Sequence, residues 1–152
     1  MRWIGLILLC LSLAGCASVE VANHEESIDR YQNAIAPMLE EWKIVVHDWE
    51  KAAGIEKSDP DRAVDAKSAQ TRMQNIISSW DSVSPPDKLR EYHLWIRHAM
   101  DYEKEAFRVM SEYYSLGYEP DPNELRHLRN LATELWVMKD KALQKADDAL
   151  HK

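Results

Sequence analysis

The apolar residues between Ser27 and Ala53 recur at alternating spacings of three and four positions. They are Ile28, Tyr31, Ile35, Met38, Trp42, Val45, Trp49 and Ala52. This spacing lays one apolar stripe along a single face of an α-helix, and such a stripe must be buried against neighbouring helices. Pro37 lies inside the segment and removes one backbone hydrogen bond, so we expect a kink there, within a helix that stops at Gly54.

Three further segments carry apolar stripes with helical spacing. Ser58-Asp59-Pro60, Ser84-Pro85-Pro86 and Asp121-Pro122 precede them, and a capping residue followed by proline is typical of a helix N-terminus. The stripes comprise Ala66, Ala69, Met73, Ile76, Trp80 and Val83; Leu89, Ile96, Met100, Phe107, Met110 and Tyr114; and Leu125, Leu128, Leu131, Leu135, Met138, Ala142 and Ala149. No alternating strand pattern recurs and the connections are short. The sequence therefore predicts an all-α fold, an up-down-up-down four-helix bundle with coiled-coil-like seams.

The first sixteen residues have a different character. Met1-Arg2 supplies a positive charge, and an apolar run from Trp3 to Leu13 follows it. The run is too short to span a bilayer as a helix, which takes about 20 apolar residues. A charge, a short apolar run and small residues in this order are typical of an export signal. The segment ends in Leu13-Ala14-Gly15-Cys16, which resembles the lipobox of bacterial lipoproteins.

The resemblance to lipoproteins implies cleavage before Cys16, a diacylglyceryl thioether on its sulfur and acylation of its new amino group. Two or more acyl chains hold a protein stably at a bilayer. We therefore expect a signal peptide over 1–15, a lipidated cysteine and tether over 16–26, and the four-helix bundle over 27–152. Ser18 stands where lipoprotein sorting often reads an aspartate as an inner-membrane signal. The resemblance thus implies the bacterial cell envelope and, in a cell with two membranes, the outer membrane facing the periplasm.

Charge and cysteine content exclude several classes of function. The full chain has a formal net charge of −7, and loss of Arg2 with the signal makes it −8. Nucleic-acid binding demands clustered Lys and Arg, so we expect no nucleic-acid partner. Cys10 leaves with the signal and Cys16 is lipidated, so no thiol remains for catalysis or zinc. A single Glu124-x-x-His127 pair lacks the second pair of a carboxylate di-metal site, and we expect no cofactor.

Two polar residues, His93 and Glu103, fall on or beside the inward stripe of the third predicted helix. In an antiparallel bundle, Glu103 should lie near the level of Trp136 and Lys139, and of Lys67. A buried carboxylate needs a partner or takes up a proton. Glu103 therefore has two interpretations: a polar contact at the edge of the core that sets the helix register, or a ligand-facing acid in a small cavity.

Aromatic residues gather in two parts of the third helix: Trp95 with Tyr92, Leu94 and Tyr102, and, near the last connection, Tyr113, Tyr114 and Tyr118. The first group either widens the buried face or leaves an exposed aromatic patch. An exposed patch would fit a partner protein or a glycan surface. The second group allows the same interpretation.

No catalytic motif is present in the sequence: a nucleophile elbow, a phosphate-binding glycine loop, an HExxH zinc motif and a dinucleotide fingerprint are all missing. We therefore expect no enzyme. The prediction is a membrane-anchored envelope lipoprotein whose helical domain is a protein-interaction or structural module. Its partners would be the bilayer, through acylated Cys16, and an envelope protein. The alternative is a small-ligand or metal carrier that uses the bundle interior around His93 and Glu103.

Overall fold

The computed structural model describes residues 19–54, 58–117 and 120–151, with side chains from Glu26 onward. The predicted signal peptide and the Leu13-Ala14-Gly15-Cys16 motif lie outside the described residues.

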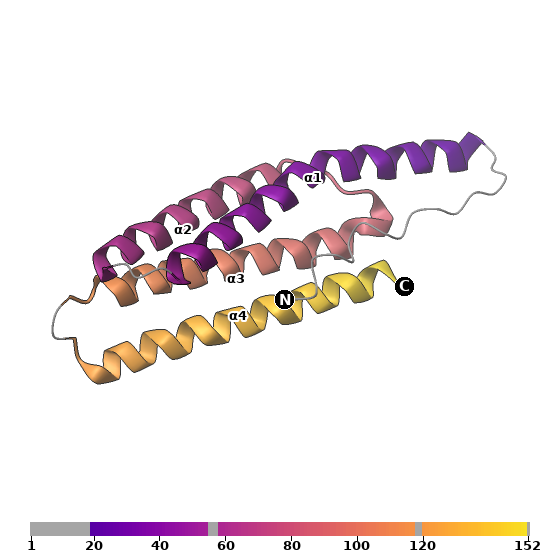
Figure 1. Ribbon diagram of the computed structural model, residues 1–152. Coiled ribbons are helices and arrows are strands. Elements are labelled where there is room, and N and C mark those ends of the chain that lie inside the picture. Colours follow the sequence, from indigo (N-terminus) through magenta and orange to yellow (C-terminus); the bar gives the residue numbers. More distant parts are fainter. Residues whose placement is uncertain (1–18, 55–57, 118–119, 152) are drawn as a thin grey trace.

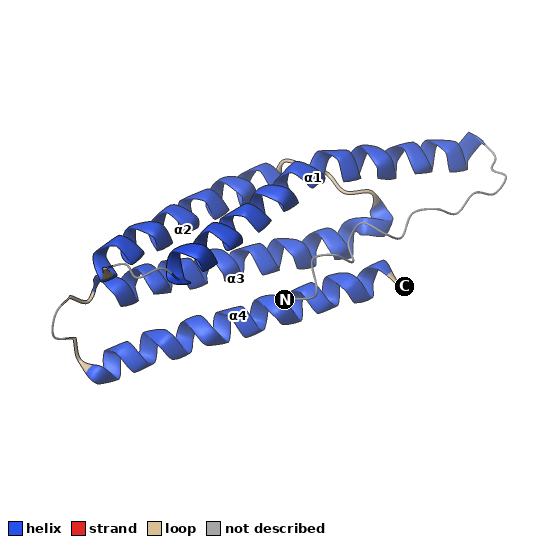
Figure 2. Ribbon diagram, viewed as in Figure 1, coloured by secondary structure: helices blue, strands red, loops and turns tan. Residues whose placement is uncertain are grey.

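Four long helices make up the described chain, and Figure 2 shows no strand in this part of the molecule. They are α1 (Val19–Gly54), α2 (Asp59–Asp81), α3 (Arg90–Ser115) and α4 (Pro122–Leu150), with a short 3-10 helix, η2 (Asp87–Leu89), before α3. Close backbone packing joins α1 to α2, α2 to α3 and α3 to α4. Successive helices run in opposite directions (Figure 1), which confirms the predicted up-down-up-down bundle.

The predicted N-terminal helix signals act as expected at Ser58 and Asp121. The Ser58 hydroxyl accepts a hydrogen bond from the Asp61 backbone N–H at 3.4 Å, and the Asp121 carboxylate accepts one from the Asn123 N–H at 2.8 Å. Both bonds satisfy backbone donors that a helix N-terminus leaves free. Gly117 follows α3 with a φ of 78°, the left-handed conformation that glycine adopts at little cost after a helix C-terminus.

Two helix boundaries differ from the prediction. Helix α1 begins at Val19 instead of Ser27, so most of the predicted tether is helical. No glycine or proline interrupts residues 19–26, so nothing in this sequence opposes the helix. At the other boundary, α3 begins at Arg90, after the Ser84-Pro85-Pro86 segment, because proline disfavours helical geometry in the residue before it.

Helix α1 continues through Pro37 without interruption. Figure 1 shows α1 changing direction about halfway along its length, and its N-terminal part projects beyond the other helices. A bend in this part of the helix agrees with the kink expected where proline removes a backbone hydrogen bond.

The main core lies where the stripes of α1, α2 and α3 meet. Trp42, Trp49 and Trp80 are buried, as predicted, and the edge of the Trp49 ring contacts Phe107 with a centroid distance of 5.7 Å. The other buried apolar residues of these helices include Tyr31, Ile35, Val45, Met73, Ile76, Ile77, Tyr92, Ile96 and Met100. The core therefore joins these three helices, and Ala142 and Ala146 of α4 belong to the same buried cluster.

Helix α4 packs differently from the prediction. Its fully buried residues are Ala132, Ala142 and Ala146, whereas its leucines are only partly buried and Met138 is 43% exposed. The predicted stripe was therefore wrong at Met138, whereas its Ala142 is buried and its leucines are partly buried. In the described part of the chain α4 packs closely on α3, and its alanines let these two helices approach closely.

Candidate functional site

Glu103 lies in the contact between α3 and α4 and is almost fully buried. The Trp136 indole N–H donates a hydrogen bond to Glu103 Oε1 at 3.2 Å, and Lys139 Nζ forms an ion pair with Oε2 at 3.1 Å. Lys67, the third predicted neighbour, instead donates to Gln70 at 2.9 Å. The geometry therefore has the form of a polar contact that fixes the register of α4 on α3.

The environment of Glu103 disfavours its charged form. Burial raises the pKa of the Glu103 carboxyl above its ordinary value of 4.5, while the Lys139 ammonium and the Trp136 indole offset part of that rise. Asp140, on α4, adds a smaller repulsion. The charged carboxylate thus depends on the ion pair, because without Lys139 only the Trp136 indole N–H would offset its loss of hydration.

His93 lies at a second polar contact, where α1, α2 and α3 meet. Its Nδ1 atom is hydrogen-bonded to the Tyr31 hydroxyl at 2.9 Å, and its ring stacks on Trp80 with a centroid distance of 4.6 Å. The Trp80 indole N–H donates to the His93 backbone carbonyl at 3.3 Å. Burial lowers the pKa of the His93 imidazole, against an opposing effect of Asp81. His93 therefore contributes to holding three helices together.

The structure does not bring the predicted site residues into one site. His93 and Glu103 are ten positions apart on α3, or about 15 Å of helix, and contact different helices. Tyr92 is buried, so the exposed-patch interpretation was wrong for this residue. Trp95 is partly exposed, and Lys145 Nζ lies 4.0 Å from the centroid of its ring. The indole N–H of Trp136 is hydrogen-bonded to Glu103.

One groove of about 390 Å³ lies where α1 passes the connection between α2 and α3. Its wall contains Arg30 and Tyr31 from α1 and Val83, Pro85 and Pro86 from the connection. Arg30 already pairs with Glu26, with 3.6 Å between the charged atoms. The groove is shallow and its polar groups are few, so it offers little with which to orient a ligand.

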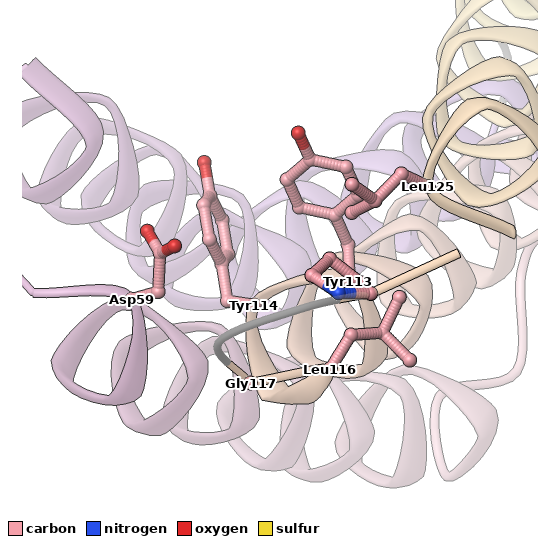
Figure 3. Close-up of a pocket in the computed structure, with 7 residues that line it drawn as sticks. Asp59, Tyr113, Tyr114, Leu116, Gly117 and Leu125 are labelled. Carbon is pink, nitrogen blue, oxygen red and sulfur yellow. The ribbon is translucent and has the colours of Figure 1, made fainter. Parts of the chain in front are cut away.

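A second recess, of about 300 Å³, lies at the opposite end of the bundle and is lined by Asp59, Tyr113, Tyr114, Leu116, Gly117, Pro120 and Leu125. The two tyrosine rings meet edge to face with a centroid distance of 5.0 Å. Figure 3 shows both hydroxyl groups directed to the same side. Neither hydroxyl makes a hydrogen bond to another described residue. We call this feature the tyrosine recess.

The tyrosine recess has a rigid base. The Tyr114 ring lies against Trp49 of the core, with 6.3 Å between the ring centroids. The guanidinium of Arg62, on α2, lies 5.6 Å from the centroid of the Tyr114 ring. Asp59 pairs with Arg62 at 3.4 Å. The recess thus combines aromatic faces, two hydroxyl groups with no partner among the described residues, and a carboxylate, which can together hold a partner's apolar and hydrogen-bonding groups.

The sequence indicated part of the tyrosine recess. Tyr113 and Tyr114 were predicted as an aromatic group near the last connection, and Tyr118 lies outside the described residues. Asp59 and Leu125 were missed as recess residues, because they belong to the first turns of α2 and α4. The predicted up-down topology would have indicated Asp59 and Leu125, since it brings the start of α2 and the start of α4 to the end of α3.

Comparison with known proteins gives no match to a protein family, to a curated protein or to a solved structure. No helix in the described part of the chain is long and apolar enough to cross a membrane. The described residues contain no group of three or more His, Cys, Asp or Glu side chains placed to hold a metal ion. Glu124 and His127 are both exposed at the start of α4.

Proposed function

We propose that this protein is a lipid-anchored envelope module that engages another envelope protein through the tyrosine recess. The anchor rests on the lipobox-like Leu13-Ala14-Gly15-Cys16 sequence. The recess lies at the end of the bundle opposite the start of α1, where the anchor would attach. Up to about 50 Å of helix separates the two, since α1 has 36 residues at 1.5 Å each. The bundle then acts as a rigid spacer between anchor and contact.

The observation that carries this proposal is the pair of tyrosines in the recess. Tyrosine offers a large contact area with few rotatable bonds and a hydroxyl for a hydrogen bond, and it is enriched at protein interfaces. Here both rings are partly exposed, both hydroxyls are free of described partners, and Tyr114 is held by the core. Such a preorganised surface lowers the entropy cost of binding a partner.

Changing Cys16 to serine is expected to abolish lipid attachment, because the acyl thioether needs the cysteine sulfur. The variant should lose the processing specific to lipoproteins and leave the membrane fraction. Metabolic labelling with a fatty acid and fractionation of the cells measure both effects. A variant that is still labelled, or that is cut at the same bond and stays with the membranes, would contradict the anchor.

A photoreactive phenylalanine analogue in place of Tyr113 is expected to form an adduct with a second envelope protein in intact cells. It keeps an aromatic ring in the recess, so the contact surface is largely preserved. The matched control carries the same analogue in place of Ile44, which is exposed on α1 and does not line the recess. Adducts should form at position 113 and not at position 44. Equal labelling at both positions, or none at 113, would count against the recess.

A further inference from the structure

The described wall of the tyrosine recess carries negative charge and no positive charge. Asp59 is its carboxylate, and no lysine or arginine of the described chain lines it. The Asp59 side chain is 66% exposed, and its Oδ2 atom makes no hydrogen bond to another described residue. Glu124, directly before the lining residue Leu125, is exposed and likewise makes no ion pair within the described chain. A cationic group is therefore the charge complement of this recess.

Three polar groups of the recess are directed to one side. In Figure 3 the Asp59 carboxylate and the hydroxyl groups of Tyr113 and Tyr114 point the same way, with Tyr114 between the other two residues. Burial raises the pKa of the Tyr114 hydroxyl against an opposing effect of Arg62, so this hydroxyl stays neutral. The row thus offers one charged acceptor and two neutral hydroxyl groups beside aromatic rings. A group with several donors can engage more than one of these oxygens at once.

The chain already holds one guanidinium with two of these residues. Arg62 Nη1 lies 3.4 Å from Asp59 Oδ1, and the Arg62 guanidinium lies 5.6 Å from the centroid of the Tyr114 ring. Arg62 itself does not line the recess. A planar guanidinium suits such a pair, because its fork of donors matches a carboxylate and its face stacks on an aromatic ring. A carboxylate has acceptor sites for more than one donor, so Asp59 can also bind a second guanidinium, from the recess side.

The size and the apolar part of the recess fit a single long side chain. Its volume is about 300 Å³, which is at the lower end for a small-molecule pocket. Leu116, Pro120 and Leu125 give it apolar wall, and Figure 3 shows Leu125 beside the Tyr113 ring. An arginine side chain combines an apolar methylene stem with a charged head, and such a stem packs on apolar surface.

We propose that the tyrosine recess binds an arginine side chain of the envelope partner. The guanidinium donates to Asp59 and to the tyrosine hydroxyl groups and stacks on the Tyr113 ring, while the methylene stem packs on Leu125. Lysine fits less well, because its compact and strongly hydrated ammonium has no planar face to stack. The existence of the partner rests on the proposed function, whereas the preference for a guanidinium rests on the recess alone.

The test uses blocked amino acids as probes on the full chain, purified in mild detergent. N-acetyl-arginine amide is titrated into protein that carries 3-fluorotyrosine, and fluorine NMR follows the rings, with Tyr113 assigned by the loss of its signal in Tyr113→Phe. The arginine probe should shift the signals of Tyr113 and Tyr114 in a saturable way. The matched probe is N-acetyl-citrulline amide, which has nearly the same shape without the charge and should cause no saturable shift. N-acetyl-lysine amide should bind more weakly than the arginine probe.

Three variants assign the binding to the recess. Asp59→Asn should weaken binding of the arginine probe about fivefold, since an exposed ion pair contributes modestly. Tyr113→Leu removes one ring and keeps an apolar side chain, and it should weaken binding about threefold, with Tyr114 as the reporter. The matched control is Asp61→Asn, which removes the same charge two residues further along α2 at a position that does not line the recess. It should change the affinity less than twofold.

The outcomes separate this proposal from the proposed function. Citrulline or lysine probes that bind as tightly as arginine, or an Asp59→Asn chain that binds arginine as wild type does, would overturn the guanidinium site. If such a result came with a photoadduct at position 113 in cells, the recess would remain a protein contact of another chemistry. Selective binding of the arginine probe without any adduct at position 113 would support the guanidinium site and count against the envelope partner.

Discussion

Replacing Trp80 with alanine is expected to lower the free energy of unfolding by about 3–5 kcal/mol. Trp80 is fully buried, and its ring stacks on His93 while its indole N–H donates to the His93 backbone carbonyl. The alanine variant leaves a cavity at the junction of α2 and α3 and removes this hydrogen bond. Chemical denaturation of the full chain, followed by far-ultraviolet circular dichroism, measures the loss.

Two companion variants separate the causes of that loss. Trp80→Phe keeps most of the volume and removes the indole donor, so it should cost much less, about 1–2 kcal/mol. Trp95→Ala makes the same change as Trp80→Ala at a partly exposed position and should cost about 1 kcal/mol. Equal effects of the alanine variants at positions 80 and 95 would mean that Trp80 is not the buried anchor of α2.

The core of α1, α2 and α3 could be predicted from sequence because its stripes are uninterrupted. Trp42, Trp49 and Trp80 recur at helical spacing and all three are buried. The capping residues Ser58 and Asp121 also signalled their helices correctly. These features are local: a stripe and a cap follow from residue spacing within one helix, without knowledge of what lies beside it.

The packing of α4 could not be predicted in the same way. Its leucines have the spacing of a buried seam, yet its alanines form the contact with α3. Both sets are apolar and their faces overlap, since Ala142 continues the leucine spacing, so the stripe alone does not say which residues a neighbour covers. Which residues of α4 are covered depends on how many helices lie beside it, and the number of neighbours is a property of the whole bundle. Asp59 and Leu125 were missed as residues of the tyrosine recess for the same reason, because their contribution depends on how the helices pack together.

Glu103 was predicted more fully than any other polar residue. Its level against Trp136 and Lys139 follows from antiparallel pairing of α3 and α4, and both contacts are present. Lys67 was predicted at the same level but does not reach Glu103. Helix α2 packs on another side of α3, and Lys67 is exposed and bonded to Gln70. Register can thus be read from topology, whereas the side of the helix on which a partner lies needs the packed structure.

Changing Lys139 to methionine is expected to cost about 3 kcal/mol of unfolding free energy near pH 8. The aliphatic stem of the side chain is kept, but Glu103 is left as a buried charge with only the Trp136 donor. This estimate is at the low end for a broken buried ion pair, because Lys139 retains some contact with water. Lys141→Met, two residues further along α4 and exposed, is the matched control and should change stability by less than about 0.5 kcal/mol.

The loss at Lys139→Met should shrink as the pH falls. Burial already raises the pKa of Glu103 above 4.5, and removing the ammonium raises it further. Between 4.5 and that raised pKa the folded chain binds a proton that the unfolded chain does not, so acidification through this window stabilises the fold. Denaturation at about pH 5 should therefore show a smaller difference from wild type than at pH 8. The double variant Glu103→Leu/Lys139→Met removes both charges and should recover most of the stability, without this pH dependence. A loss that persists in the double variant, or that does not change with pH, would mean that α4 is held by packing around Lys139 and not by its charge.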